Sequence, residues 1–393
     1  MSTSNDGFDA LKNKFESVSH VLETKAADLN SSKLFGLWEN EFPVLIKGIV
    51  KALGRDVKKE IYPLSEEDMA DVFSSLNHRL DSLVSLIEST MNTICRNSAI
   101  HEFISYSLRD LGFSKKIPYL LCIKPSMETI SITSNCETYF SGPLYPTTNE
   151  FLRKYKKRLS GFWIINLPPS VLENKPYWSL LIHEIGHILN ESLKLVENYN
   201  DKETNSGFTQ KFRNYNHGRE FISDYIANTY CGPVFYKSLY EHLGRYGVLH
   251  GNVNEHPRTD ARFFFMQEKL KGIIDNPKKI KKDPKIDHHD MVENLDKIIT
   301  DTRKKIFKNK KSVYKKVDSE INKAIKQLEH LVPFLGEPTI LLNAYSEKEN
   351  EILKEIEQRD KEMDIVQVQN KVGRIIEDSI RLKNMKRTFE IME

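Results

Sequence analysis

Two histidines and a glutamate within residues 178–189 have the types and spacing of a zinc site. His183 and His187 are four residues apart, and Glu184 directly follows the first histidine. On a helix this spacing places both imidazoles on one face, about one turn apart, where they can occupy two corners of a tetrahedral zinc site. Glu184 is then angled so that its carboxylate reaches a metal-bound water. This H-E-x-x-H pattern predicts zinc ligands at His183 and His187 and a general base at Glu184.

The residues around the pattern are apolar and predict a helix that is buried on most sides. They are Leu181, Ile182, Ile185, Ile188 and Leu189. Two histidines and a glutamate are costly to bury without a partner, and a bound metal would offset that cost. The alternative is a helix with two ordinary core histidines and a glutamate.

A catalytic zinc site needs a third protein ligand, and the segment 219–233 supplies one. Glu220 and Asp224 are four residues apart in what the pattern predicts to be a second helix, so they share a face. We expect Glu220 to be the third ligand and Asp224 to accept the outer N–H of His183. His217 is a competing third ligand, and the alternative interpretation is an exposed acidic face capped by Arg219.

In metzincins the third ligand is a histidine six residues after the second histidine of the motif, and a glycine stands three residues after that second histidine. Leu193 and Asn190 stand at those positions here, which excludes that subclass. The order H-E-x-x-H and then E-x-x-x-D is instead the pattern of gluzincins, the thermolysin-like zinc peptidases.

One branch of the gluzincins is more similar still. The CAAX prenyl protease and heat-shock protease HtpX-like family has H-E-x-x-H, E-x-x-A-D, and then H-P with an arginine six residues after that histidine. In this chain the first motif lies at 183–187 and the second at 220–224, with Ser223 in place of alanine. The third is His256-Pro257, followed by Arg262. The resemblance covers 162–265, roughly a quarter of the chain. ImmA/IrrE-like peptidases are a second resemblance, through the segment around Glu220.

The resemblance implies a zincin-like core in which His256 and Arg262 flank the metal and bind substrate carbonyls or the oxyanion. It also implies an edge strand at 162–167 that an extended peptide could join. The alternative for His256 is a plain turn before a helix at 258–270. The membrane helices of that family are missing, so a membrane-embedded substrate is not expected.

The periodicities predict a predominantly helical α+β protein with three regions. Residues 1–115 form a helical N-terminal region, and 116–275 a metallopeptidase domain with a small sheet from strands at 117–123, 129–133 and 162–167. Residues 276–393 read as a charged linker and two long helices that turn near 333–338. These would form a hairpin or a coiled coil with another subunit.

Composition indicates a cytoplasmic protein. The 393 residues carry a net charge of +3, with no signal peptide, no membrane-spanning apolar run and four scattered cysteines that we expect to be reduced. Basic stretches at 278–285 and 303–316 are typical of solvated helix faces, so nucleic acid is not the favoured partner.

The sequence therefore predicts a zinc metalloendopeptidase acting on a protein or peptide, with possible partners at the C-terminal helices. The alternative is a non-catalytic helical scaffold with a structural or vestigial metal site. Structural zinc usually has cysteine-rich, closed ligand sets, and Cys231 is the cysteine nearest the motif by sequence, beyond the Glu220 helix. That favours an open, catalytic site.

Overall fold

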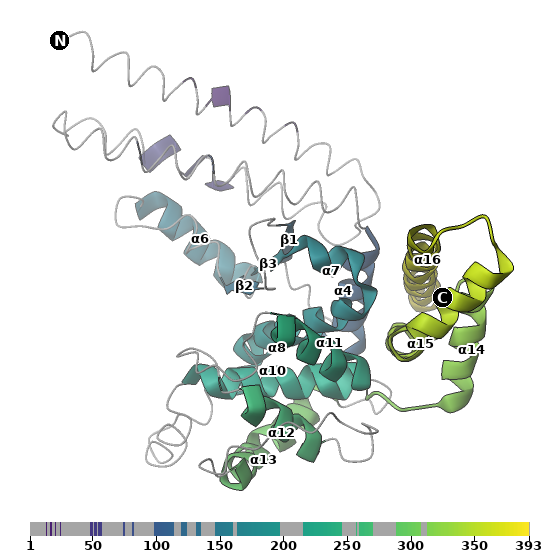
Figure 1. The fold of residues 1–393 in the computed structure, drawn as a ribbon. Helices are drawn as coiled ribbons and strands as arrows, with labels where there is room; N and C mark the ends of the chain where they lie inside the picture. Colours follow the sequence, from purple (N-terminus) through teal and green to yellow (C-terminus); the bar gives the residue numbers. More distant parts are fainter. Residues whose placement is uncertain are drawn as a thin grey trace. The chain divides into compact units, whose positions relative to one another are not determined.

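The structure is a computed structural model of the chain (Figure 1). It describes residues 98–113, 119–123, 131–134, 146–159, 163–196, 215–245, 257, 259–269, 288–307 and 313–392, with scattered positions before residue 98. Most of the helical region expected at 1–115 lies outside the described residues. Within it, α4 (Ser98–Asp110) is described as a helix.

The described part of the chain is predominantly helical with one small sheet, as the sequence predicted. It divides into two compact units. One comprises Met1–Arg96 with Lys115–Pro168, and the other comprises Asn97–Ser114 with Pro169–Glu393. The three regions expected from the sequence stay a prediction.

The first unit contains a three-stranded sheet, in the order β1-β3-β2. Strand β3 (Trp163–Leu167) pairs in parallel with β1 (Tyr119–Ile123) and antiparallel with β2 (Ser131–Ser134), and α6 (Pro146–Leu159) precedes β3. Every residue of β3 is buried, in keeping with its unbroken apolar sequence. The expectation of an edge strand at 162–167 was wrong, because strands on both sides of β3 already use its backbone hydrogen-bonding groups.

The second unit contains α4 and then α7 (Pro169–Glu173), the 3-10 helix η2 (Lys175–Tyr177) and α8 (Trp178–Leu193). Pro176 in the first turn of η2 suits the start of a helix, and Lys194 ends α8 in the left-handed conformation. Two serine hydroxyls, of Ser179 and Ser238, donate to the Pro176 carbonyl at 2.7 and 3.0 Å. This junction therefore ties the start of α8 to α11.

Four further helices continue the unit. They are α10 (Tyr215–Cys231), α11 (Pro233–Arg245), α12 (Thr259–Lys269) and α13 (His288–Ile306). Helix α10 contacts α8, α11, α12 and α13, and its pairing with α8 is the most extensive helix contact in the described part of the chain. The candidate site lies along that α8–α10 contact.

The C-terminal region contains α14 (Asp318–Glu329), α15 (Pro338–Arg359) and α16 (Ile365–Met392). Helices α14 and α15 pack against each other across a turn close to the predicted one, and α16 packs against α4 and α15. The two long helices expected from the sequence are therefore α13 to α16, four separate helices. No helix within the described ranges is long and apolar enough to cross a bilayer.

A tertiary contact fixes Tyr314, which lies in the described segment just before α14. The Tyr314 amide donates to the Thr229 carbonyl at 2.9 Å, and its ring lies against Gly232, where a Cβ would come within 2.3 Å of it. Gly232 has a φ of 69°, which glycine adopts without strain. The contact with α10 holds Tyr314 outside any helix, although the spacing of apolar residues is helical.

Candidate metal centre

Helix α8 places the H-E-x-x-H side chains inside the second unit. Every residue from Trp178 to Gly186 is buried, including His183 and Glu184, while His187 is partly exposed. A helix that is apolar almost all round is typical of a core helix. The three polar side chains therefore lie at one face of a helix that is otherwise packed among apolar neighbours.

The opposite wall of the site is α10, and a glycine lets it come unusually close. A Cβ built on Gly186 would lie 2.8 Å from the Cα of Ser223 and 3.2 Å from its carbonyl oxygen. Gly186 stands just before His187, and Ser223 stands between Glu220 and Asp224. The contact between these two backbones consequently brings the histidine face of α8 against the carboxylate face of α10.

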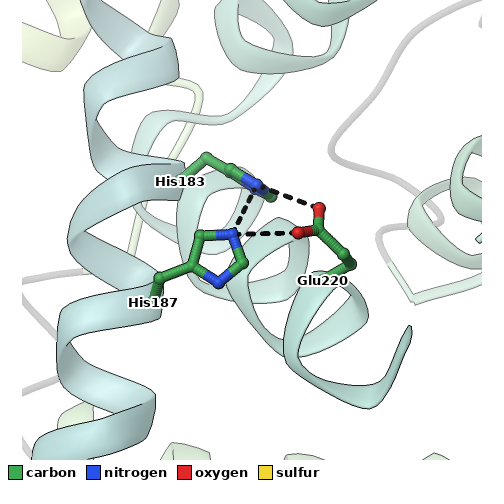
Figure 2. Close-up of side chains that lie close together, drawn as sticks. All are labelled: His183, His187 and Glu220. Carbon is green, nitrogen blue, oxygen red and sulfur yellow. Dashed lines mark hydrogen bonds and ion pairs between the residues drawn. The ribbon is translucent and has the colours of Figure 1, made fainter. Parts of the chain in front are cut away.

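Three potential ligand residues converge at this contact (Figure 2). The Nε2 atoms of His183 and His187 are 3.1 Å apart. Glu220 Oε2 is 3.3 Å from the first of them, and Glu220 Oε1 is 3.2 Å from the second. A tetrahedral ion with bonds of about 2.0–2.1 Å has ligand atoms about 3.3 Å apart. The donor set and its spacing therefore fit zinc.

Asp224 lies behind the first histidine. Its Oδ1 is 3.0 Å from His183 Nδ1, although the ring is not aligned for a linear hydrogen bond. A carboxylate on the Nδ1 side favours the tautomer with its proton there, which leaves a lone pair on Nε2. That lone pair faces Glu220 and His187, so a cation has ligands ready on this side of the ring.

The buried charges leave the site short of positive charge. Three carboxylates, of Glu184, Glu220 and Asp224, are buried with one guanidinium, of Arg262. If all four are ionised and both imidazoles are neutral, these groups carry a net charge of −2. A bound divalent cation would balance it, whereas without a metal a proton on His183, whose pKa is raised, offsets part of it.

The pKa values of the ligands reflect this demand for cations. Burial lowers the pKa of His183, but its contacts with Asp224 and Glu220 outweigh burial and raise that pKa to about 10. Burial raises the pKa of Glu220, yet His187 and Arg262 hold it well below its ordinary value. Both directions follow from the attraction between a protonated His183 and the carboxylates beside it.

Glu184 behaves differently from the two acidic residues of α10. Burial raises its pKa above the ordinary value, and the lowering by His183 and His187 does not cancel this effect. A carboxylate with a raised pKa binds a proton more readily, which suits a group that accepts a proton and passes it on.

Arg262, on α12, pairs with Asp224 and also lies 3.4 Å from Oε2 of Glu220, a candidate metal ligand. Its Nε and Nη2 atoms each lie 2.7 Å from an Asp224 oxygen. His256 and the side chain of His217 lie outside the described residues. The alternative of an exposed acidic face is excluded, because Glu220 is 6% and Asp224 0% exposed, and Arg219 pairs with Glu191 instead.

Two features of the site were missed in the sequence. The contact of Gly186 with Ser223 has a signal, since a glycine inside a buried helix indicates a close backbone approach. The pairing of Arg262 with Asp224 has none, because 38 residues separate the two side chains along the chain.

Comparison of the chain with protein-family models, with curated proteins and with solved structures found no match. The motif resemblance to gluzincins and the geometry of the site are therefore the grounds on which function can be proposed.

Proposed function

We propose that this chain is a zinc-dependent metallopeptidase of the gluzincin type, with a zincin-like core and with His183, His187 and Glu220 as metal ligands. The observation that carries the proposal is the convergence of their ligand atoms at 3.1–3.3 Å inside a buried site. The resemblance supplies the substrate class, a protein or a peptide.

A catalytic site is favoured over a structural one by the number and type of ligands. The group of potential ligands found among the described residues has three members, with atoms within 4.8 Å of one another, and no cysteine. Structural zinc sites are usually closed by four ligands and rich in cysteine, whereas catalytic sites use three protein ligands and leave a position for water.

When bound, zinc would lower the pKa of a water molecule and polarise the scissile carbonyl. Glu184 is the proton carrier, which accepts a proton from the attacking water and delivers it to the leaving amine. Asp224 keeps His183 in the tautomer that can donate its Nε2 lone pair. Burial of these side chains strengthens each electrostatic interaction among them.

The ligand set is tested by measuring tightly bound metal in the purified chain by mass spectrometry. We expect close to one zinc per chain in the wild type and in His217→Ala, and little in Glu220→Ala. If Glu220→Ala retained zinc and His217→Ala lost it, the third ligand would be His217 and not Glu220. A wild type that takes up no added zinc would overturn the proposal.

Hydrolysis is tested with Glu184→Gln against the wild type, on a mixture of unstructured peptides read by mass spectrometry. The variant should keep its zinc and lose cleavage by about 10²- to 10⁴-fold, the usual contribution of a general base. Cleavage that is equal in both proteins would come from a contaminant and would leave the scaffold alternative standing.

A further inference from the structure

We propose that Arg262 is a positioning residue, which clamps Asp224 and thereby holds the His183 ring in place for the metal. This inference rests on the proposed zinc site. It differs from the role that the resemblance implies, in which the arginine binds the oxyanion of the reacting substrate.

The clamp is a two-point contact between α12 and α10. Arg262 Nε donates to Asp224 Oδ2 and Nη2 donates to Oδ1, both at 2.7 Å. Arg262 is 6% exposed and Asp224 is fully buried. A paired, short contact of this kind between guanidinium and carboxylate sets the orientation of both groups as well as their distance.

The contact continues from Asp224 to the metal ligands. Asp224 Oδ1, which accepts from Arg262, is also the atom 3.0 Å from His183 Nδ1. The Nη2 of Arg262 is in addition 3.4 Å from Glu220 Oε2. One guanidinium thus touches the carboxylate behind one ligand and the carboxylate of another, so its position affects two of the three ligands.

The same geometry argues against the oxyanion role. An oxyanion donor must point its N–H groups at the place where charge develops on the substrate. The Nε and Nη2 edge of Arg262, which could bind two oxygen atoms at once, is occupied by Asp224. Breaking that pair to bind substrate would leave the buried, ionised Asp224 carboxylate without its guanidinium partner.

The test measures metal binding in the full chain, without a substrate. Zinc affinity is determined by competition with a chelator for the wild type, Arg262→Lys, Arg262→Gln and Asp224→Asn. The visible spectrum of the cobalt(II) form of each protein reports ligand geometry. Arg387→Gln is the matched control, because Arg387 pairs with Asp110 at 3.0 Å in the same unit but between α16 and α4.

We expect zinc affinity to fall about 10- to 100-fold in the Arg262 and Asp224 variants, the usual effect of removing a partner behind a metal ligand. The cobalt bands should shift in these variants and stay unchanged in Arg387→Gln. The double variant Arg262→Gln/Asp224→Asn should lose little more than either single variant, because both act through one contact. The double variant also removes both buried charges, so its metal binding can be measured even if Arg262→Gln alone does not fold.

Arg262 variants with wild-type zinc affinity and wild-type cobalt spectra would overturn the positioning role, while leaving the zinc site intact. If those variants also lost hydrolysis, the oxyanion role would replace it. A wild type that binds neither zinc nor cobalt would instead overturn the proposed function itself.

Discussion

Gly186→Ala should weaken the candidate metal site without unfolding the protein. The new methyl carbon would lie 2.8 Å from Ser223 Cα and 3.0 Å from its Cβ. Carbon atoms in contact are about 3.5–4.0 Å apart, so α8 and α10 must separate by about 1 Å here. The obstacle is backbone on a packed helix, which cannot rotate away as a side-chain tip can.

The size of the effect follows from that movement. Separating the helices would lengthen the distances from Glu220 to His183 and His187, now 3.3 and 3.2 Å, toward about 4 Å. A tetrahedral zinc ion needs about 3.3 Å. We expect zinc affinity to fall about 10- to 100-fold, as when a partner behind a ligand is lost. Overpacking should lower the free energy of unfolding by about 1–3 kcal/mol, and the better helix propensity of alanine should restore about 1 kcal/mol of this.

The assay is zinc competition with a chelator, together with urea unfolding of the metal-free protein. Gly373→Ala on α16 is the matched control, since its nearest obstacle is a side-chain atom, Lys175 Cε at 3.3 Å, rather than backbone. That variant should keep zinc affinity. Wild-type zinc affinity in Gly186→Ala would refute the reasoning that this backbone contact sets the ligand spacing.

Three further predictions concern individual buried groups. Ser223→Ala should raise the free energy of unfolding by about 1 kcal/mol in urea titrations, because the buried Ser223 hydroxyl has no hydrogen-bond partner among the described residues; a lower free energy of unfolding would contradict this reasoning. Burial lowers the pKa of His101 to about 4 from 6.5, so the folded state binds fewer protons than the unfolded state between these values. Stability should then fall by up to about 3 kcal/mol as pH drops from 6.5 to 4, and His101→Gln should lessen the fall; equal pH slopes in urea titrations of both proteins would contradict this. Added zinc should raise the unfolding temperature of the wild type but not of His187→Ala, which scanning calorimetry can check; an equal rise in both proteins would argue against His187 as a ligand.

Local patterns were sufficient to predict the three strands and which side chains lie on α8 and α10. Four-residue spacing places His183 with His187, and Glu220 with Asp224, whatever surrounds them. Apolar β-branched runs likewise predicted strands where β1, β2 and β3 lie. These features depend on the period of a helix or strand, which is a property of neighbouring residues.

Other features depend on contacts between distant residues and could not be read from spacing. The strand at Trp163–Leu167 is central because β1 and β2 lie on its two sides. Tyr314 lies outside a helix, where its amide donates to the Thr229 carbonyl and its ring lies against Gly232. Apolar periodicity indicates which face is buried, but it does not say against what.

The sequence by itself determined which side chains could form a metal site and which helices carry them. The tertiary structure decided how far apart those side chains are, because the closeness of Gly186 to Ser223 brings their potential ligand atoms within 4.8 Å of one another. It also decided what Arg262 faces. A buried guanidinium pairs with the nearest uncompensated carboxylate, and only packing of α12 on α10 makes that carboxylate Asp224.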